Sequence, residues 1–166
     1  MKSILITILV LGSAVVGLWW YADKRTAEIE AQKETRRVAE ENAVREERLE
    51  LFGEAALNPK IVWSELSGLG ILILEEGTGA KPLPGAEVTF SYKVTLKDGT
   101  EVDRTGEPTD ARIGQMISGV SAGLMKTKGG GRSLLFIPAK LAYGRQAYGP
   151  IPKNSALLFE IELMKP

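Results

Sequence analysis

The feature that most restricts the fold is an alternation of apolar and charged side chains near the C-terminus. In this stretch Leu157, Phe159, Ile161 and Leu163 alternate with Leu158, Glu160 and Glu162. Successive side chains of an extended chain point to opposite faces, so the pattern predicts a strand with one face in a core. The preceding loop, LAYGRQAYGPIPKNSA, is then expected to lie over the end of a packed sheet.

Glycine and proline divide the rest of the C-terminal part into similar short strands. Three segments fit this description: GLGILILEEGTG, AEVTFSYKVTLKDGTEVD and GRSLLFIP. The second contains Asp98-Gly99, a pair that favours a tight hairpin turn between two strands. The third is stopped by Pro138, because proline cannot donate to a sheet.

One short helix is predicted among these strands, in the segment MISGVSAGLMK. Its helical spacing places four apolar residues on one face: Met116, Ile117, Val120 and Leu124. Ser118 is the expected N-cap, and Gly119 and Gly123 weaken the helix. The sequence therefore predicts an α+β fold, with an antiparallel sheet wrapped around one short helix.

Residues 1–22 carry a different signal, because residues 3–22 contain no charged side chain. A helix of that length spans roughly 30 Å, the thickness of the hydrocarbon core of a bilayer. We therefore predict a membrane-spanning signal anchor, with aromatic residues from Trp19 to Tyr21 at the headgroup interface. The alternative is a cleaved signal peptide, with Gly12 and Ala14 as the small residues before the cut.

The side of the membrane follows from two opposing signals. Lysine and arginine gather after residue 22, which favours a cytoplasmic C-terminal part. The very short tail before the apolar run instead favours export of everything that follows it. We expect a single-pass protein whose C-terminal part is periplasmic or otherwise extracytoplasmic.

Residues 23–57 are rich in glutamate, arginine, alanine and lysine, all strong helix formers. Apolar residues are too scarce for a sustained heptad seam, so we predict a solvated helical stalk. Weak self-association through a coiled coil is the alternative. Asn58-Pro59 breaks any helix, so the C-terminal domain is expected to cover residues 58–166.

The overall composition excludes several classes of function. The 21 basic and 21 acidic residues balance, so no field attracts nucleic acid. The chain has no cysteine and no histidine, which removes thiol chemistry, the commonest metal ligand and the commonest general base. We expect no metal site and no cofactor.

Four motifs together resemble one protein family. KDGTEVDRT, GQMISGVSAGLMKTKGGGR, IPAKLAYG and IPKNSALLFEIEL stand in the order and spacing of the FKBP-type peptidyl-prolyl cis-trans isomerases. The resemblance covers roughly residues 68–164. It implies a half-barrel sheet curled around the helix, with an apolar pocket between them that receives a proline side chain.

The resemblance also implies which residues form the site. Tyr143 would donate to the substrate carbonyl, with Asp103 and Tyr92 ordering the polar rim. The implied substrate-binding residues are Val102, Met116, Ile117, Val120, Tyr148, Ile151 and Phe159. Three places depart from the best-known family pattern: Val102 replaces an aromatic residue, Val120 replaces a tryptophan, and the neighbourhood of Thr109 lacks a phenylalanine. The pocket is therefore expected to be wide and poor in aromatic rings.

Two functions remain open at this point. One is a membrane-anchored isomerase that acts on proline-containing polypeptides during folding. The other is a non-catalytic FKBP-like module that binds peptides as a scaffold or chaperone. The small residues at the departures favour the second function, and the retained Tyr143, Asp103, Tyr92 and Phe159 favour the first.

Overall fold

The computed structural model describes the backbone of residues 2–165 and the side chains of residues 18–165. The chain divides into two compact units, residues 1–46 and residues 47–166. Each unit is described by itself.

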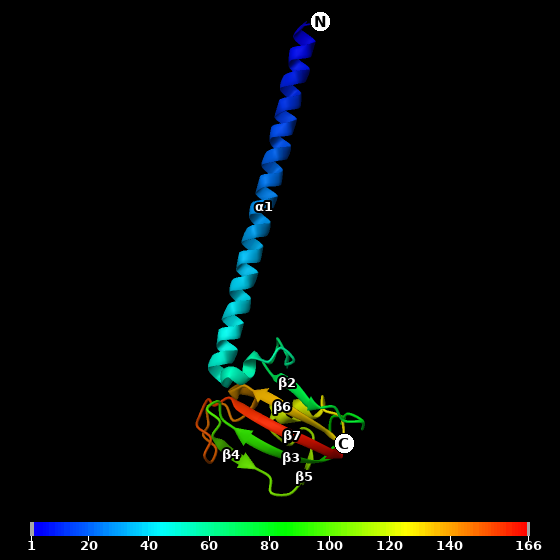
Figure 1. The fold of residues 1–166 in the computed structure, drawn as a ribbon, viewed down its shortest axis with the longest axis vertical. Coiled ribbons are helices and arrows are strands. Elements are labelled where there is room, and N and C mark those ends of the chain that lie inside the picture. Colours follow the sequence, from blue (N-terminus) through cyan, green and yellow to red (C-terminus); the bar gives the residue numbers. More distant parts are fainter. Residues whose placement is uncertain (1, 166) are drawn as a thin grey trace. The chain divides into compact units, whose positions relative to one another are not determined.

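A single helix, α1, runs from Lys2 to Phe52 and contains residues 23–52 of the predicted stalk (Figure 1). The last residues of that segment, Gly53–Leu57, form a 3₁₀ helix. On its surface Arg37 pairs with both Glu34 and Glu41, at helical spacings that support an exposed helix. Most of the predicted anchor, residues 3–22, lies outside the residues whose side chains are described. Among the described residues, the structure contains no helix with an apolar stretch long enough to cross a membrane.

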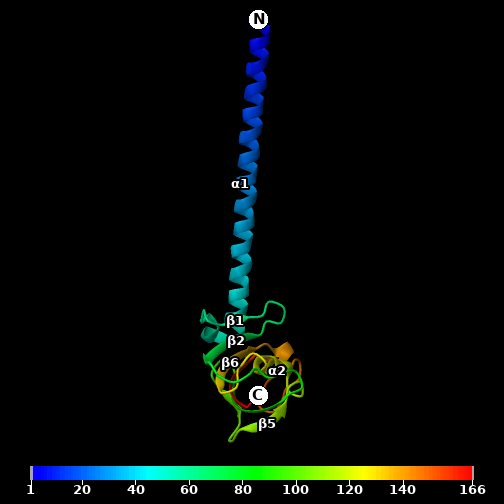
Figure 2. The ribbon, with the colours of Figure 1, turned by 90° about the vertical axis from the view of Figure 1, so that its right-hand side faces the viewer.

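The second unit contains a seven-stranded antiparallel sheet, shown in Figures 1 and 2. In spatial order its strands are β1 (Val62–Trp63), β2 (Gly70–Glu75), β6 (Gly131–Ile137), β7 (Leu157–Lys165), β3 (Glu87–Thr95) and β4 (Glu101–Arg104). The seventh strand, β5 (Thr109–Arg112), also pairs with β3. Two short 3₁₀ helices, Gly53–Leu57 and Ala139–Leu141, and the helix α2 (Ser118–Leu124) complete the unit.

The α+β prediction with an antiparallel sheet is confirmed. The strands predicted from the three segments appear as β2, β3 with β4, and β6. The turn between β3 and β4 contains Gly99 at φ +84°, and the Asp98 carboxylate accepts a hydrogen bond from the Thr100 N–H at 2.9 Å. Sequence analysis missed β1 and β5, because one has two residues and the other, TDAR, has no apolar alternation.

The main core lies between the sheet and α2. The four inward residues of β7, from Leu157 to Leu163, are buried, while Glu162 is exposed, as the alternation predicted. Gly119 and Gly123 lie directly against β6, where an added Cβ atom would collide with the side chains of Ile137 and Leu135. These glycines weaken the helix locally, but they let it approach the sheet.

The prediction of Ser118 as the N-cap of this helix is wrong. Ile117 holds the capping position, and Ser118 is the first helical residue. The Ser118 hydroxyl donates instead to the carbonyl of Leu141, at 3.3 Å. Ser118 therefore ties α2 to the loop that follows β6.

A second, smaller core lies on the outer face of the sheet. It contains Phe52, Ile61, Leu72, Phe136, Ala156 and Leu158. The rings of Phe52 and Phe136 pack edge to face with centroids 5.5 Å apart. This core explains why Leu158, on the outward face of β7, is apolar and buried while Glu162 on that face is exposed.

The end of α1 belongs to this second core. Phe52 is only 2% exposed, and the Arg48 guanidinium lies 4.4 Å from the centre of the Trp63 ring. The Lys97 amine donates to the carbonyl of Glu50 at 3.2 Å. The compact unit thus begins at Glu47, whereas the sequence placed the start of the domain at residue 58. Independent folding of residues 58–166 stays a prediction.

Candidate functional site

Eight of the ten residues that the resemblance implied belong to the main core or pack against it, and the other two contact members of that set. Val120, Ile151 and Phe159 are buried members of that core. Half-buried side chains that pack against it are Tyr92, Val102, Met116, Ile117 and Tyr143. The remaining two, Asp103 and Tyr148, contact Tyr92 and Tyr143 respectively. We call these ten residues the prolyl cluster. They come from α2, β3, β4, β7 and two loops, so their contacts form only in the folded chain.

The polar side of the prolyl cluster is a tyrosine–aspartate pair across β3 and β4. The Tyr92 hydroxyl donates to the Asp103 carboxylate at 3.0 Å. Burial and this hydrogen bond to the carboxylate raise the pKa of Tyr92 to about 12. The Tyr92 ring also lies 5.7 Å from the ring of Phe159, so one side chain joins the polar and apolar parts of the cluster.

Tyr143 lies beside this pair in the loop after β6. Its ring stacks on Tyr148 with centroids 4.4 Å apart and planes only 5° from parallel. Burial raises the pKa of Tyr143, and the neighbouring Tyr148 and Asp103 raise it further. The Tyr143 phenol is therefore protonated at neutral pH and available as a hydrogen-bond donor.

The loop that carries Tyr143 is held by its own backbone. Tyr148 and Ile151 exchange two N–H to carbonyl bonds of 2.9 Å, which close a small hairpin. The Asn154 N–H donates to the carbonyl of Gly144 at 2.7 Å, and both residues adopt a positive φ of 60°. Each of the two tyrosines in this loop is followed by a glycine with a positive φ, Gly144 and Gly149. Glycine adopts this left-handed conformation without steric cost, so the chain can turn directly after each tyrosine.

Three further residues near the prolyl cluster were not predicted from the sequence. Thr105 accepts a hydrogen bond from the Tyr92 N–H at 3.0 Å and so fixes the backbone of that tyrosine. The Phe90 ring lies 5.8 Å from the Tyr92 ring, as the two-residue period of a strand could have indicated. Ala111 of β5 packs against the core near the position where the sequence analysis noted a missing phenylalanine.

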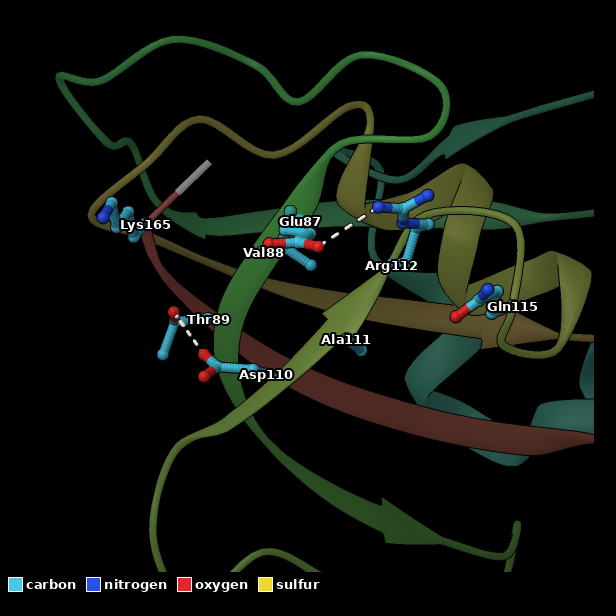
Figure 3. Close-up of a pocket in the computed structure, with 8 residues that line it drawn as sticks. All are labelled: Glu87, Val88, Thr89, Asp110, Ala111, Arg112, Gln115 and Lys165. Carbon is cyan, nitrogen blue, oxygen red and sulfur yellow. Dashed lines mark hydrogen bonds and ion pairs between the residues drawn. The ribbon is translucent and has the colours of Figure 1, made fainter.

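A separate hollow at β3 and β5 does not have the character of a binding site (Figure 3). It has a volume of about 440 Å³ and is lined mainly by polar side chains. Arg112 pairs with Glu87 at 3.2 Å, and Thr89 donates to Asp110 at 2.7 Å. Arg112 and Glu87 therefore neutralise each other, and the Asp110 carboxylate has a hydroxyl partner. Within the described part of the chain, no three acidic side chains gather in the way that metal ligands do.

Comparison with known proteins agrees with this geometry. Residues 79–164 match the family model of the FKBP-type peptidyl-prolyl cis-trans isomerases. The FKBP-type isomerase FkpA of Escherichia coli K12 is 38% identical over 116 residues, which are 68% of this chain and 43% of that protein. The outer membrane protein MIP of Legionella longbeachae is 42% identical over 102 residues, covering 59% of this chain and 44% of that protein. The matched part is thus less than half of each relative.

A solved structure extends the similarity to the fold. The crystal structure of Escherichia coli FkpA matches with a TM-score of 0.64 and 34% identity, over 90% of this chain and 70% of that one. The family match covers most of the sheet and every residue of the prolyl cluster. This chain therefore belongs to the FKBP-type peptidyl-prolyl cis-trans isomerase family.

Proposed function

We propose that this protein catalyses the cis–trans isomerisation of prolyl bonds in polypeptides and thereby assists their folding. The observation that carries the proposal is the neutral Tyr143 phenol beside the Tyr92–Asp103 pair, at the edge of an apolar cluster. Family membership supports the same activity.

The reaction suits a site without nucleophile or base. Rotation about a prolyl bond must cross a barrier of roughly 20 kcal/mol, because the planar amide is stabilised by resonance. The twisted amide has lost that resonance and is less polar. A water-excluding apolar site therefore favours the twisted amide over the planar one, which is the differential stabilisation that catalysis requires.

Each part of the prolyl cluster then has a role in the proposed reaction. Met116, Ile117 and Phe159 would hold the proline ring, with Val102, Val120 and Ile151 behind them. Tyr143 would donate to the substrate carbonyl, and Tyr148 would hold the Tyr143 ring by stacking. Asp103 would order the rim through Tyr92.

Tyr143→Phe tests this assignment, because it removes one hydroxyl and keeps the ring. Loss of one hydrogen bond in the transition state costs about 1 to 2 kcal/mol, so kcat/KM should fall roughly tenfold with little change in stability. The measurement is isomerisation of a proline tetrapeptide by the full-length protein. Tyr21→Phe, a substitution in α1, is the matched control and should retain full activity.

The second candidate function is peptide binding without catalysis. Ala111 and Val120 favour it, because small side chains at the core grip a proline ring less tightly. A wild-type protein that binds the tetrapeptide but does not accelerate its isomerisation, with binding unchanged by Tyr143→Phe, would establish this function in place of catalysis.

We further propose that residues 3–22 anchor the protein in a membrane and place the domain on the extracytoplasmic side. The uncharged sequence supports the anchor, and the name of the Legionella relative supports an envelope location. Full-length protein should fractionate with membranes, and a reporter fused after residue 166 should work only outside the cytoplasm. Recovery of intact full-length protein in the soluble fraction would contradict the anchor.

Self-association through the stalk is a further proposal about the same region. It would be weak, because the large exposed apolar residues of the stalk are few: Ile29, Val38, Val44 and Leu57. Analytical ultracentrifugation of the full-length protein in detergent would measure it. A strictly monomeric protein at high concentration would contradict it.

A further inference from the structure

A second apolar surface lies between β2 and α2, and it shares no residue with the prolyl cluster. It is a groove of about 450 Å³. Its apolar lining consists of Val62, Trp63, Leu69, Ile71, Ile73 and Ala122. Leu69 and Ile71 pack in or against the main core, whereas Val62 is 72% exposed and Ile73 is 38% exposed. The base of the groove is therefore formed by apolar residues of the core, and its sides carry aliphatic side chains exposed to solvent. Exposed apolar surface of this kind is typical of a binding surface.

An unpaired strand edge runs beside this groove. β1 has only two residues, and it pairs with Gly70 and Ile71 of β2. The chain before β1 turns away, because the Ile61 N–H bonds back to the carbonyl of Asn58 at 3.2 Å. β2 nevertheless continues to Glu75. Its Ile73 lies opposite Ser133 of β6, but among the described residues no residue of β1 lies opposite it on the other edge.

The alternation of backbone groups shows which atoms this edge presents. The Leu69 carbonyl accepts from the Ser64 N–H at 2.9 Å, so the backbone of Leu69 points toward β1. Every second residue of a strand points its N–H and C=O to the same edge, so Ile73 presents both groups where β1 has already ended. A bulge follows between Ile73 and Glu75, which limits the open edge to a short stretch.

The charge of the groove has one sign. Lys81 and Lys126 line it, both exposed, and no carboxylate does. Among the described residues neither lysine forms an ion pair. Lys81 helps to lower the pKa of Glu76, but Glu76 is itself paired with Lys128 at 2.8 Å. A ligand for this groove therefore combines aliphatic side chains with a negative charge.

We propose that this groove binds an extended, proline-independent segment of the polypeptide client that carries aliphatic and acidic side chains on the same face. Such a segment would add a short strand to the edge at Ile73, so that every second side chain enters the groove. An aliphatic side chain would lie on the apolar floor, and a carboxylate two residues away would reach Lys81 or Lys126. That the segment belongs to an isomerase client rests on the proposed function. A strand edge beside a recessed groove favours a polypeptide over a bilayer surface, which offers no backbone to pair.

The test uses the fluorescein-labelled hexapeptide Val-Ser-Val-Ser-Glu-Ser, which places valine and glutamate on the same face of an extended chain and contains no proline. Its fluorescence anisotropy with full-length protein should show saturable binding that weakens with salt. Lys126→Glu should raise the Kd about tenfold, because it reverses a charge at the rim of the groove. Lys165→Glu makes the same change outside the groove and should leave the Kd unchanged. Neither variant should alter the isomerisation of a proline tetrapeptide.

Three results would overturn the proposal. They are absence of binding by wild type, an equal loss with Lys165→Glu, and displacement of the hexapeptide by the proline tetrapeptide. Binding of phosphatidylglycerol vesicles that depends on Lys126, without hexapeptide binding, would identify a membrane-facing surface instead. Because the hexapeptide has no proline, its binding by a protein without isomerase activity would refute the proposed function and leave the groove site standing.

Discussion

At the scale of single residues, the proposed site depends on two half-buried tyrosines whose phenols are hydrogen-bond donors. Tyr92 and Tyr143 have a raised pKa, and for both the largest cause is burial. A neutral phenol donates a hydrogen bond without bringing a charge into the apolar cluster. In the proposed reaction the domain would place a donor beside the twisted amide although it has no histidine and no cysteine.

The raised pKa of Tyr92 predicts how stability changes at alkaline pH. Unfolded Tyr92 releases its proton near pH 10, and folded Tyr92 does so near pH 12. Between these values the folded state binds more protons, so the free energy of unfolding should fall as pH rises through this window. Urea unfolding at several pH values will measure the slope. Tyr92→Phe should make it shallower, whereas the same slope in both proteins would contradict this prediction.

Val120 allows a second prediction at this scale. It is 3% exposed and lies in the main core, so a tryptophan at this position would have to displace packed side chains. Val120→Trp should therefore lower the free energy of unfolding by roughly 1 to 3 kcal/mol through overpacking. Val44→Trp, at an exposed position of α1, is the matched control. Unchanged stability with tighter binding of a proline peptide would show that the pocket is as wide as the sequence comparison implied.

At the scale of elements, the distance between α2 and β6 is set by glycine. An added methyl group at Gly123 would meet the Leu135 side chain, which is fully buried and has no free space. Because Val120 lies on this short helix and Ile117 directly precedes it, a shift of α2 would also move these residues of the proposed site.

Gly123→Ala should therefore destabilise the domain although alanine favours helices. The expected loss is roughly 1 to 3 kcal/mol, set by overpacking against β6. Gly106→Ala is the matched control, since nothing lies within 4 Å of its added Cβ and its φ is not positive. Thermal unfolding of both variants will measure the difference. A Gly123→Ala protein as stable as wild type would show that α2 can move away at no cost.

At the scale of the whole molecule, the C-terminal unit includes the last residues of α1. Phe52 packs between Trp63 and Phe136 in the second core, with centroid distances of 5.8 and 5.5 Å. The helix therefore contributes its end to the outer face of the sheet, and residues 47–57 belong to the same compact unit as the strands.

A comparison of two fragments tests this boundary. Residues 47–166 should unfold cooperatively, whereas residues 58–166 lose Phe52 and expose Phe136 and Leu158. Burial of a phenylalanine is worth about 3 to 5 kcal/mol, so the shorter fragment should be less stable by about that amount. Phe52→Ala in the longer fragment should reproduce the loss. Equal stability of the two fragments would return the boundary to residue 58.

Strands and turns that depend only on neighbouring residues could be predicted from the amino-acid sequence. The alternation in β7, the Asp98-Gly99 turn and the proline after β6 each act through neighbouring residues, so strands and turns could be predicted. The motifs of the C-terminal part also indicated the family and the residues of the prolyl cluster before any contact was known.

The packing of residues whose contacts are distant in the sequence could be seen only in the folded protein. Leu158 looked like an exception to the alternation until Phe52, more than a hundred positions earlier, was found to pack in the same core. Gly123 looked like a weak helical residue until Leu135 was found against it. The bond between Tyr92 and Asp103 and the stack of Tyr143 on Tyr148 likewise depend on how strands and loops pair. Local patterns fix which face of an element is apolar, but burial and contact depend on which faces meet, and that requires the folded chain.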